Sequence, residues 1–378
     1  MDFRLYFKSR QGELIGLLKE LVKLESPTSD KKAVDACSAQ AVARFRSLGA
    51  KITRLPQASV GDFHLIEWPP RAGAGGDDRI LILTHIDTVW PVGRLVQMPF
   101  YIQGDKIYGP GVLDMKAGVV MAYAALRALS DLNRKPGKRI ALFLNSSEEE
   151  SCPEADDLIR AEARRASAVL CLEPALPGGG LKIQRKGRLV VRLESSGRAA
   201  HAGQPEKGVS AVEELIGQIR KLAALRSKDV SLNVGRIGGG EKANVVAEAA
   251  WAELDFRFWT TAQKQKILAA ARTLSPVVRG AKTRATIAGA TPPLERTAAS
   301  DRLLAKAREA AAGLGLTLAA GRAGGGSDGS IAAGTGAAVL DGLGPDGDGI
   351  HAADEHCLLS SLLERAALLT EILARAGD

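Results

Sequence analysis

The predicted secondary-structure pattern changes in the middle third of the chain, and this change limits the folds that the chain can adopt. In the first and last thirds, short apolar stretches alternate with stretches of helical periodicity, which is typical of a layered α/β sheet. Between residues 181 and 288 the predicted order is β-α-β-β-α-β, the split pattern of ferredoxin-like domains. We therefore expect an α/β/α sandwich with a mixed central sheet, interrupted by an inserted ferredoxin-like α+β domain.

The expected boundaries divide the chain into residues 1–183, 184–294 and 295–378, of which the first and last parts form one domain. In these outer parts, helices are predicted at 2–25, 31–48, 114–130, 154–164, 299–313 and 357–376, and strands at 51–55, 63–68, 79–84, 139–145, 168–172, 317–320 and 337–341. The glycine-rich stretch at 73–76 is expected to be a hairpin loop. In the inserted part, strands are predicted at 181–197, 229–237, 244–259 and 282–288, and helices at 208–225 and 261–275.

Composition restricts the class of protein further. The 378 residues carry a net charge of +8 but are only 4% aromatic, so we expect no nucleic-acid surface that stacks bases. The positive charge is either a solvated surface or a weak field that attracts small anionic substrates. There is no run of 18 apolar residues, the charged N-terminal stretch predicts a surface helix, and the four scattered cysteines form no CxxC pair. These features predict a cytoplasmic protein with no membrane partner.

Several polar residues follow the ends of predicted core strands. His85 and Asp87 end the most apolar strand, where a carboxylate can hold the second nitrogen of a metal-bound imidazole. Asp114 follows a glycine-flanked turn before a helix, a place that suits either a plain N-cap or a carboxylate that bridges two metals. Each residue alone also fits a solvated loop, but together at one sheet edge they predict a chemical site. The others expected at this edge are Glu148, Glu149, Glu173 and His351.

The motifs HxDTVxP, GxxDMKAG, EE, EP and HxxxE follow one another in this order. The sequence thereby resembles the zinc metallopeptidase family of glutamate carboxypeptidase, acetylornithine deacetylase, succinyl-diaminopimelate desuccinylase and aminoacylase, and among these it most resembles glutamate carboxypeptidase. The resemblance covers essentially the whole chain. It includes the inserted domain, which in that family is a dimerisation or lid domain, so the resemblance implies a homodimer.

The resemblance also implies two Zn²⁺ ions, for which Co²⁺ or Mn²⁺ are possible substitutes. His85, Asp114 and Glu173 would hold one ion. Asp114, Glu149 and His351 would hold the other, so that Asp114 bridges the pair. Imidazole nitrogen and carboxylate oxygen are ligands that zinc takes in proteins, and two such ions can share a hydroxide and polarise a scissile carbonyl.

Three further features follow from the same resemblance. Glu148 would be the general base that takes a proton from the metal-bridging water and returns it to the leaving nitrogen. Asp87 would orient His85. The peptide bond between Asp114 and Met115 would be cis, as it is in the family.

In the inserted domain, the stretch SGRAAHAG resembles the family segment whose histidine reaches an active site, typically that of the partner subunit. His201 would then stabilise the developing oxyanion. Asn244 and Arg257 resemble substrate-contacting residues, and a guanidinium suits a substrate carboxylate. For Arg257 the alternative is a charge pair with Asp255 or Glu253 on the strand surface.

Three other residues receive simpler interpretations. Gly325 lies in a GxGxxG-like stretch whose surroundings do not fit a dinucleotide site. In the resembled family this is a turn whose backbone N–H groups face the substrate carboxylate. His64 is expected to be structural, and His356 is expected to be a surface residue at the start of the last helix.

The resemblance implies an enzyme, a dizinc hydrolase that releases a C-terminal amino acid, with glutamate as the first choice, from a small peptide or N-acyl amino acid. The alternative is a deacylase of the acetylornithine deacetylase or succinyl-diaminopimelate desuccinylase type. Glutamate at position 173 is similar to both groups, whereas aminopeptidases of the family tend to have aspartate there. A non-catalytic binding protein on the same fold would be expected to lack a ligand, yet all five ligands and Glu148 are present.

Overall fold

The computed structural model describes residues 2–70, 78–150 and 152–376. These residues form two compact units. Unit 1 is built within Met1–Ile183, Arg296–Ala323 and Ser327–Asp378, and unit 2 consists of Gln184–Glu295 with Gly324–Gly326. The glycine-rich stretch at 73–76 lies outside the described residues.

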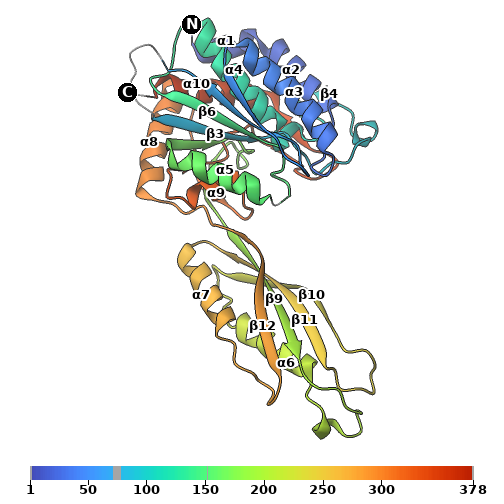
Figure 1. Ribbon diagram of the computed structural model, residues 1–378. Coiled ribbons are helices and arrows are strands. Elements are labelled where there is room, and N and C mark those ends of the chain that lie inside the picture. The colour runs from blue at the N-terminus through green and yellow to red at the C-terminus, as the bar shows by residue number, and fades with distance from the viewer. Residues whose placement is uncertain (1, 71–77, 151, 377–378) are drawn as a thin grey trace. The chain divides into compact units, whose positions relative to one another are not determined.

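Unit 1 contains a mixed six-stranded sheet, as expected (Figure 1). Its strands β3, β6, β7 and β14 run parallel to one another, and β1 and β2 are antiparallel to their neighbours. The hydrophobic positions in the parallel strands point to both faces, which is typical of a sheet covered on both sides. In sheet order the strands are β1 Lys51–Leu55, β2 Phe63–Trp68, β6 Arg139–Asn145, β3 Arg79–His85, β7 Ala166–Cys171 and β14 Val339–Leu340.

Helices cover both faces of this sheet, so the predicted α/β/α sandwich is confirmed (Figure 1). One face carries α4, rich in small residues, which packs against α2 and α10. The other face carries α5 and α9, which contact each other and β7. The helices are α1 Phe3–Ser9, α2 Gln11–Lys23, α3 Lys31–Ser47, α4 Ala117–Asp131, α5 Pro153–Arg164, α8 Ala298–Gly313, α9 Asp328–Ala333 and α10 Leu359–Ala374.

Two smaller sheets lie wholly or mostly in unit 1, which β8 leaves after Ile183. One pairs β8 with β13, and the other has the order β15-β16-β5-β4. These strands are β8 Leu181–Arg185, β13 Ala320–Ala323, β4 Tyr101–Gln103, β5 Lys106–Tyr108, β15 Gly347–Asp348 and β16 His356–Leu358. Within the described ranges, no helix is both long and apolar enough to cross a membrane.

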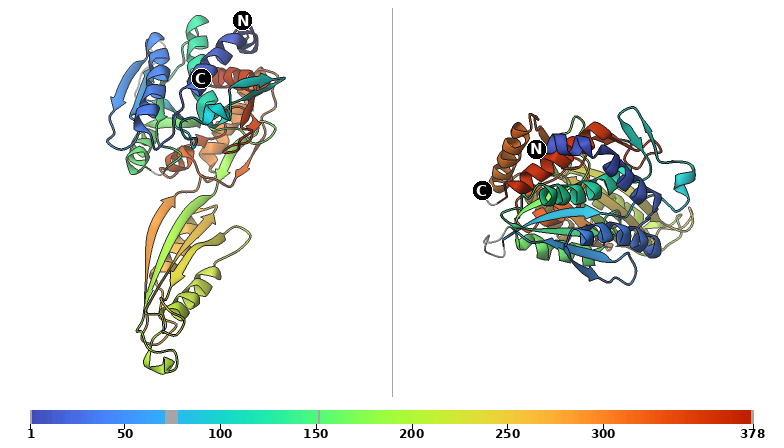
Figure 2. Two further views of the ribbon diagram at one scale, coloured as in Figure 1. Left: turned by 90° about the vertical axis from the view of Figure 1, so that its right-hand side faces the viewer. Right: turned by 90° about the horizontal axis from the view of Figure 1, so that it is seen from above.

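Unit 2 has the predicted β-α-β-β-α-β order, and its antiparallel sheet follows the ferredoxin-like order β10-β11-β9-β12. Buried and less buried positions alternate along β11, because one face of the sheet packs against α6 and α7. In Figure 2 this unit is the yellow-green to orange part of the ribbon. Its elements are β9 Gly187–Ser196, α6 Ala211–Ala223, β10 Ser231–Gly239, β11 Ala249–Phe258, α7 Thr261–Arg272 and β12 Lys282–Thr291.

The structure differs from the predictions at a strand that is divided between two sheets and at the start of a helix. The single strand expected at 181–197 is two strands, β8 and β9, because its halves pair in different sheets. The helix expected from residue 114 begins at Ala117, after a π-helical turn at Val112–Lys116 in which Asp114 and Met115 have non-helical backbone angles. The peptide bond between these two residues is cis, as expected.

The prediction for His356 was wrong. This residue lies in β16 rather than in the last helix, and it is buried. It pairs with Tyr108 across the small sheet, and the centroids of the two rings are 5.0 Å apart. Long-range strand pairing therefore overrides the helical pattern that begins nearby. His64 is buried on β2, which agrees with a structural role.

Candidate active site

The carboxyl ends of the parallel strands in unit 1 bring the predicted residues together. His85 is the last residue of β3, whose seven positions are all buried, and it lies beside Asn145 at the end of β6. Glu148 and Glu149 follow β6 directly, and Glu173 follows β7. Because parallel strands end at a common edge, residues distant in sequence converge there.

Asp114 occupies the centre of this cluster. Its Oδ1 lies 3.2 Å from His85 Nε2, and its Oδ2 lies 3.5 Å from His351 Nε2. His85 Nε2 is also 3.6 Å from Glu173 Oε1, and His351 Nε2 is 3.2 Å from Glu149 Oε1. One oxygen of Asp114 therefore faces the pair of His85 and Glu173, and the other oxygen faces the pair of His351 and Glu149.

Asp87 lies behind the cluster and is fully buried. Its backbone carbonyl is 3.0 Å from His85 Nδ1, and its Oδ1 is 3.4 Å from the same nitrogen. Its carboxylate also accepts the backbone N–H groups of Glu148 and Glu149, each at 3.2 Å. The Thr28 hydroxyl donates to it at 2.7 Å. Asp87 therefore contacts both the imidazole and the acidic loop.

The electrostatics of the cluster are strongly perturbed. Burial and the nearby charge of Glu173 raise the pKa of Glu148 well above its usual range. Hydrogen bonds to Asp114 and Glu149 raise the pKa of His351 to about 10. Burial alone would lower the pKa of His85, but Asp114 and Asp87 raise it instead. The carboxylates therefore favour the protonated forms of both imidazoles, which indicates a site that attracts cations.

The donor set fits divalent metal ions. Ligand atoms of His85, Glu148 and Glu173 lie within 4.8 Å of one another, as do those of His85, Asp114 and Glu149. Imidazole nitrogens and carboxylate oxygens are the ligands that zinc takes in hydrolytic sites. An aspartate with each oxygen directed at a different group is suited to bridge two ions.

The four predicted residues outside this cluster belong to unit 2. The exposed residues His201 and Asn244 lie on adjoining loops, where the Ala202 N–H donates to the Asn244 carbonyl at 2.9 Å. Nδ1 of His201 accepts the Gly203 N–H at 3.0 Å. Gly325 lies in a turn, and its carbonyl accepts a hydrogen bond from the Arg185 guanidinium at 3.3 Å.

Arg257 forms the ion pair that the alternative interpretation expected. It lies on β11, and its Nε donates to Asp255 Oδ1 at 2.8 Å. The other oxygen of Asp255 accepts from Arg188 at 2.7 Å. A substrate carboxylate at Arg257 would therefore compete with Asp255.

Sequence reasoning missed several residues that support the cluster. Thr28 carries no local signal, because its contact with Asp87 spans 59 residues. Asp328 is a buried acid whose burial raises its pKa to about 7, and it accepts from the Asn145 side-chain amide at 2.9 Å. The Asn145 side-chain oxygen in turn accepts the Ser147 N–H at 3.0 Å, beside the acidic loop. A Ser-Asp pair following the glycine-rich turn was a usable signal for Asp328.

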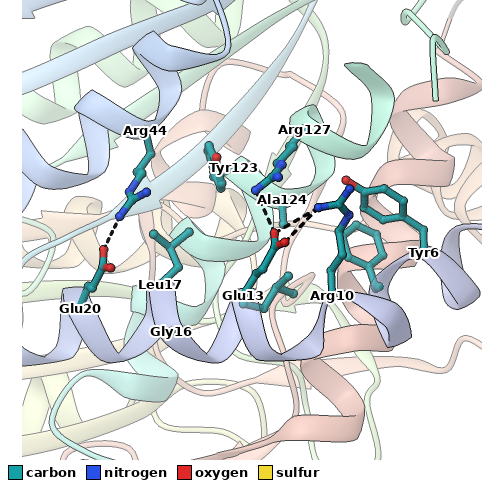
Figure 3. Close-up of a pocket in the computed structure, with 12 residues that line it drawn as sticks. Tyr6, Arg10, Glu13, Gly16, Leu17, Glu20, Arg44, Tyr123, Ala124 and Arg127 are labelled. Atoms are coloured by element: carbon teal, nitrogen blue, oxygen red, sulfur yellow. Dashed lines mark hydrogen bonds and ion pairs between the residues drawn. The ribbon is translucent and has the colours of Figure 1, made fainter. Parts of the chain in front are cut away.

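A separate cavity lies between α1, α2, α3 and α4 (Figure 3). Its volume is about 300 Å³, and its described lining includes none of the predicted site residues. Glu13 pairs with Arg10 at 3.0 Å and with Arg127 at 2.9 Å, while Glu20 pairs with Arg44 at 2.6 Å. Because each charged side chain of its lining is already in an ion pair, we assign this cavity no ligand.

The fold and the cluster together define a class of protein, the metal-dependent hydrolases with an inserted ferredoxin-like domain. Comparison with known families agrees. The sequence model described as peptidase family M20/M25/M40 matches residues 81–375, so the chain belongs to this family and is a metal-dependent hydrolase.

Individual relatives extend the comparison. Carboxypeptidase G2 from Pseudomonas sp. (strain RS-16) is 28% identical over 383 residues, covering 97% of this chain and 90% of that protein. Succinyl-diaminopimelate desuccinylase from Delftia acidovorans is 26% identical over 318 residues, covering 78% of this chain and 81% of that protein. Among solved structures, the aminopeptidase PepT from Bacillus cereus has a TM-score of 0.79 at 24% identity, covering 97% of this chain and 99% of that one. This last likeness concerns the fold alone.

Proposed function

We propose that unit 1 is the catalytic domain of a dizinc hydrolase that releases a C-terminal amino acid, glutamate in the first instance, from a small peptide or N-acyl substrate. The observation that carries the proposal is the position of Asp114, whose two oxygens face the imidazoles of His85 and His351. The match to carboxypeptidase G2 over nearly the whole chain supports the carboxypeptidase assignment.

The proposed metal ligands are divided into two sets. His85, Asp114 and Glu173 would hold one zinc, and Asp114, Glu149 and His351 would hold the second, with Co²⁺ or Mn²⁺ as substitutes. When bound, such ions polarise a carbonyl and lower the pKa of water. The protein supplies a fixed donor set in which Asp87 keeps His85 and the acidic loop in place.

Glu148 is proposed as the general base. Its carboxylate takes a proton from the attacking water and then delivers it to the nitrogen of the leaving amine. Its raised pKa supports this role, because a carboxylate with greater proton affinity is a better base near neutral pH. The hydrogen bond from its backbone N–H to Asp87 orients the loop that carries it.

Unit 2 is proposed to bind substrate and to form a homodimer. His201 and Asn244 are exposed on adjoining loops, so both are available to a substrate. Arg257 would exchange Asp255 for the substrate carboxylate, and the N–H groups of the turn at Gly325 would face the same carboxylate. The strand β10 is at an edge of the sheet in unit 2, and the backbone groups of an edge strand can pair with a strand of a second copy.

A panel of substrates tests the proposal. The protein reconstituted with Zn²⁺ would be assayed for amino-acid release from benzoyl-glutamate, dipeptides, N-acetylornithine and N-succinyl-diaminopimelate. We expect the glutamate conjugate or the dipeptides to be preferred. Preference for an acylated metabolite would instead establish a deacylase, the second candidate, which the match to the Delftia acidovorans desuccinylase favours. Failure on every substrate, with no Zn²⁺ bound, would contradict both.

A further inference from the structure

A buried carboxylate outside the proposed metal ligands collects four hydrogen bonds. Glu355 is only 1% exposed. Its Oε2 accepts from the Trp90 indole at 2.8 Å and from the Gly111 N–H at 3.0 Å. Its Oε1 accepts the N–H groups of Leu113 at 2.9 Å and of Asp114 at 3.2 Å. Both oxygens are therefore fully used as acceptors within unit 1.

These hydrogen bonds connect the segments that carry three of the proposed metal ligands. Trp90 lies in the loop that follows His85. The Asp114 N–H belongs to the central aspartate itself. Glu355 closes the short loop that begins at His351, and the Glu355 N–H donates to the Ala352 carbonyl at 3.1 Å. One side chain thus links the loops of both histidines to the turn of the shared aspartate.

A buried amine also holds the same turn. The Lys116 Nζ donates to the carbonyls of Leu21 at 3.0 Å and Leu24 at 2.8 Å, where α2 ends. The carboxyl end of a helix favours a cation, so this contact is satisfied without a carboxylate partner. Gly111 opens the turn at a φ of +68°, and a Cβ there would collide with Thr88. The turn therefore has few alternative conformations.

We propose that Glu355 is a positioning residue of the hydrolytic site, which fixes the backbone of Asp114 so that its two oxygens stay directed at His85 and His351. The proposal rests on the function proposed above. The physical reason is that buried N–H groups require an acceptor. If Glu355 stopped accepting, Leu113 and Asp114 would move toward another acceptor or water, and the carboxylate of Asp114 would move with them.

The Glu355→Gln variant tests this role with almost no change of shape. Whichever way the amide turns, its NH₂ group faces two of the four donors, because each oxygen of Glu355 accepts two bonds. We expect Zn²⁺ binding to the metal-free variant, measured by calorimetry, to weaken about 10–100-fold, the usual effect of losing an outer partner of a metal ligand. We expect kcat to fall by a similar factor while KM stays within about twofold of wild type.

Glu214 in unit 2 provides a matched control. It is also buried and accepts four hydrogen bonds, from the N–H groups of Val277 and Val278 at 2.7 Å each, from Gln218 at 2.5 Å and from Thr283 at 3.0 Å. The Glu214→Gln variant therefore loses comparable bonds in a unit that holds none of the proposed metal ligands. We expect it to lower the melting temperature and to leave Zn²⁺ affinity and kcat within about twofold of wild type.

The Trp90→Phe variant covers the case in which Glu355→Gln does not fold. It removes one of the four donors but keeps an aromatic ring beneath Arg94, whose guanidinium lies 4.7 Å from the ring centroid. We expect a smaller loss of Zn²⁺ affinity in the same direction. Wild-type Zn²⁺ affinity and kcat in the folded Glu355→Gln variant, or in Trp90→Phe if only that variant folds, would overturn the positioning role alone. A wild-type protein that binds no Zn²⁺ and hydrolyses nothing would overturn the proposed function and this inference with it.

Discussion

The two units differ in the balance of acidic and basic side chains on their main sheets. At the sheet edge of unit 1, the carboxylates of Asp114, Glu148, Glu149 and Glu173 lie around only two imidazoles. On the sheet of unit 2, Asp255 receives two guanidiniums, from Arg188 and Arg257, and Glu253 receives two more, from Arg192 and Arg236.

The difference in charge pairing distinguishes a candidate metal site in unit 1 from a charged surface in unit 2. Like charges held together under partial burial raise each other's energy, so the cluster in unit 1 is favourable only with additional positive charge. In unit 2 both carboxylates are already paired with guanidiniums, and the excess of guanidiniums over carboxylates gives the array a net positive charge that would attract an anionic substrate. The cluster in unit 1 is therefore where the proposed metal ions would bind, and the array in unit 2 is where the proposed function would attract a substrate carboxylate.

The largest expected effect comes from removing the proposed base. Replacing Glu148 by Ala is expected to lower kcat about 10²–10⁴-fold, because proton transfer by a positioned side chain contributes about that factor. Zn²⁺ content, measured by atomic absorption, is expected to remain at the wild-type level. Unchanged turnover with full Zn²⁺ content would remove Glu148 as the base.

Removing metal is the second test, and it concerns the excess of carboxylates over cations in the cluster of unit 1. We expect chelation to destabilise the protein by about 3 kcal/mol relative to protein with free Zn²⁺ at about 100 times the Kd. The reason is that carboxylate repulsion in the cluster is relieved only in the metal-bound native state. Melting curves with and without chelator measure this, and added Zn²⁺ should restore the original curve. Identical curves would show that the cluster needs no added cation.

A third test uses Asp62, a buried carboxylate of unit 1 that is paired with Lys31 and Arg54. Burial alone would raise the pKa of Asp62, but hydrogen bonds from Lys31, the Gln57 backbone and Arg54 lower it to about 2. The interaction therefore stabilises the native state above the unfolded pKa of about 3.9 and is lost as the pH falls toward 2. Replacing Asp62 by Asn is expected to cost about 2 kcal/mol of unfolding free energy at pH 6.

Denaturant melts of wild type and Asp62→Asn between pH 6 and pH 2 measure this contribution. The difference between the two proteins should shrink as the pH falls through that window, while Zn²⁺ affinity at pH 7 stays unchanged. A constant difference at all pH values would mean that charge pairing is not the source of the stability.

The smallest expected effect distinguishes the two arginines that share Asp255. If Arg257 binds the substrate carboxylate, replacing it by Ala should raise KM about tenfold or more, since a hydrogen bond to a charged group contributes about 1.5–3 kcal/mol. Replacing Arg188 by Ala removes the other ion pair of Asp255 and should change KM by less than about twofold. Equal effects of the two substitutions would leave Arg257 as part of a surface charge array only.

Short-range patterns were sufficient for most of the fold and for the residues of the cluster. The alternation of apolar strands and helices predicted the sandwich, because hydrophobic periodicity follows directly from backbone geometry. The same patterns failed where an element depends on a distant partner. His356 pairs with Tyr108 rather than starting a helix, and β8 separates from β9 because the two strands belong to different sheets.

The local residue pattern alone placed His85 and Glu173 at the ends of apolar strands and Asp114 after a glycine-flanked turn, and it predicted that the three lie close together, as they do in the structure. Spacing along a strand or a turn is a local property, so it is readable from the chain. The contacts that support those residues could be seen only in the folded protein. The bond from Trp90 to Glu355 spans 265 residues, and the bond from Lys116 to Leu21 spans 95. Contacts over such separations depend on how the helices and loops pack around the sheet, and no local pattern encodes them.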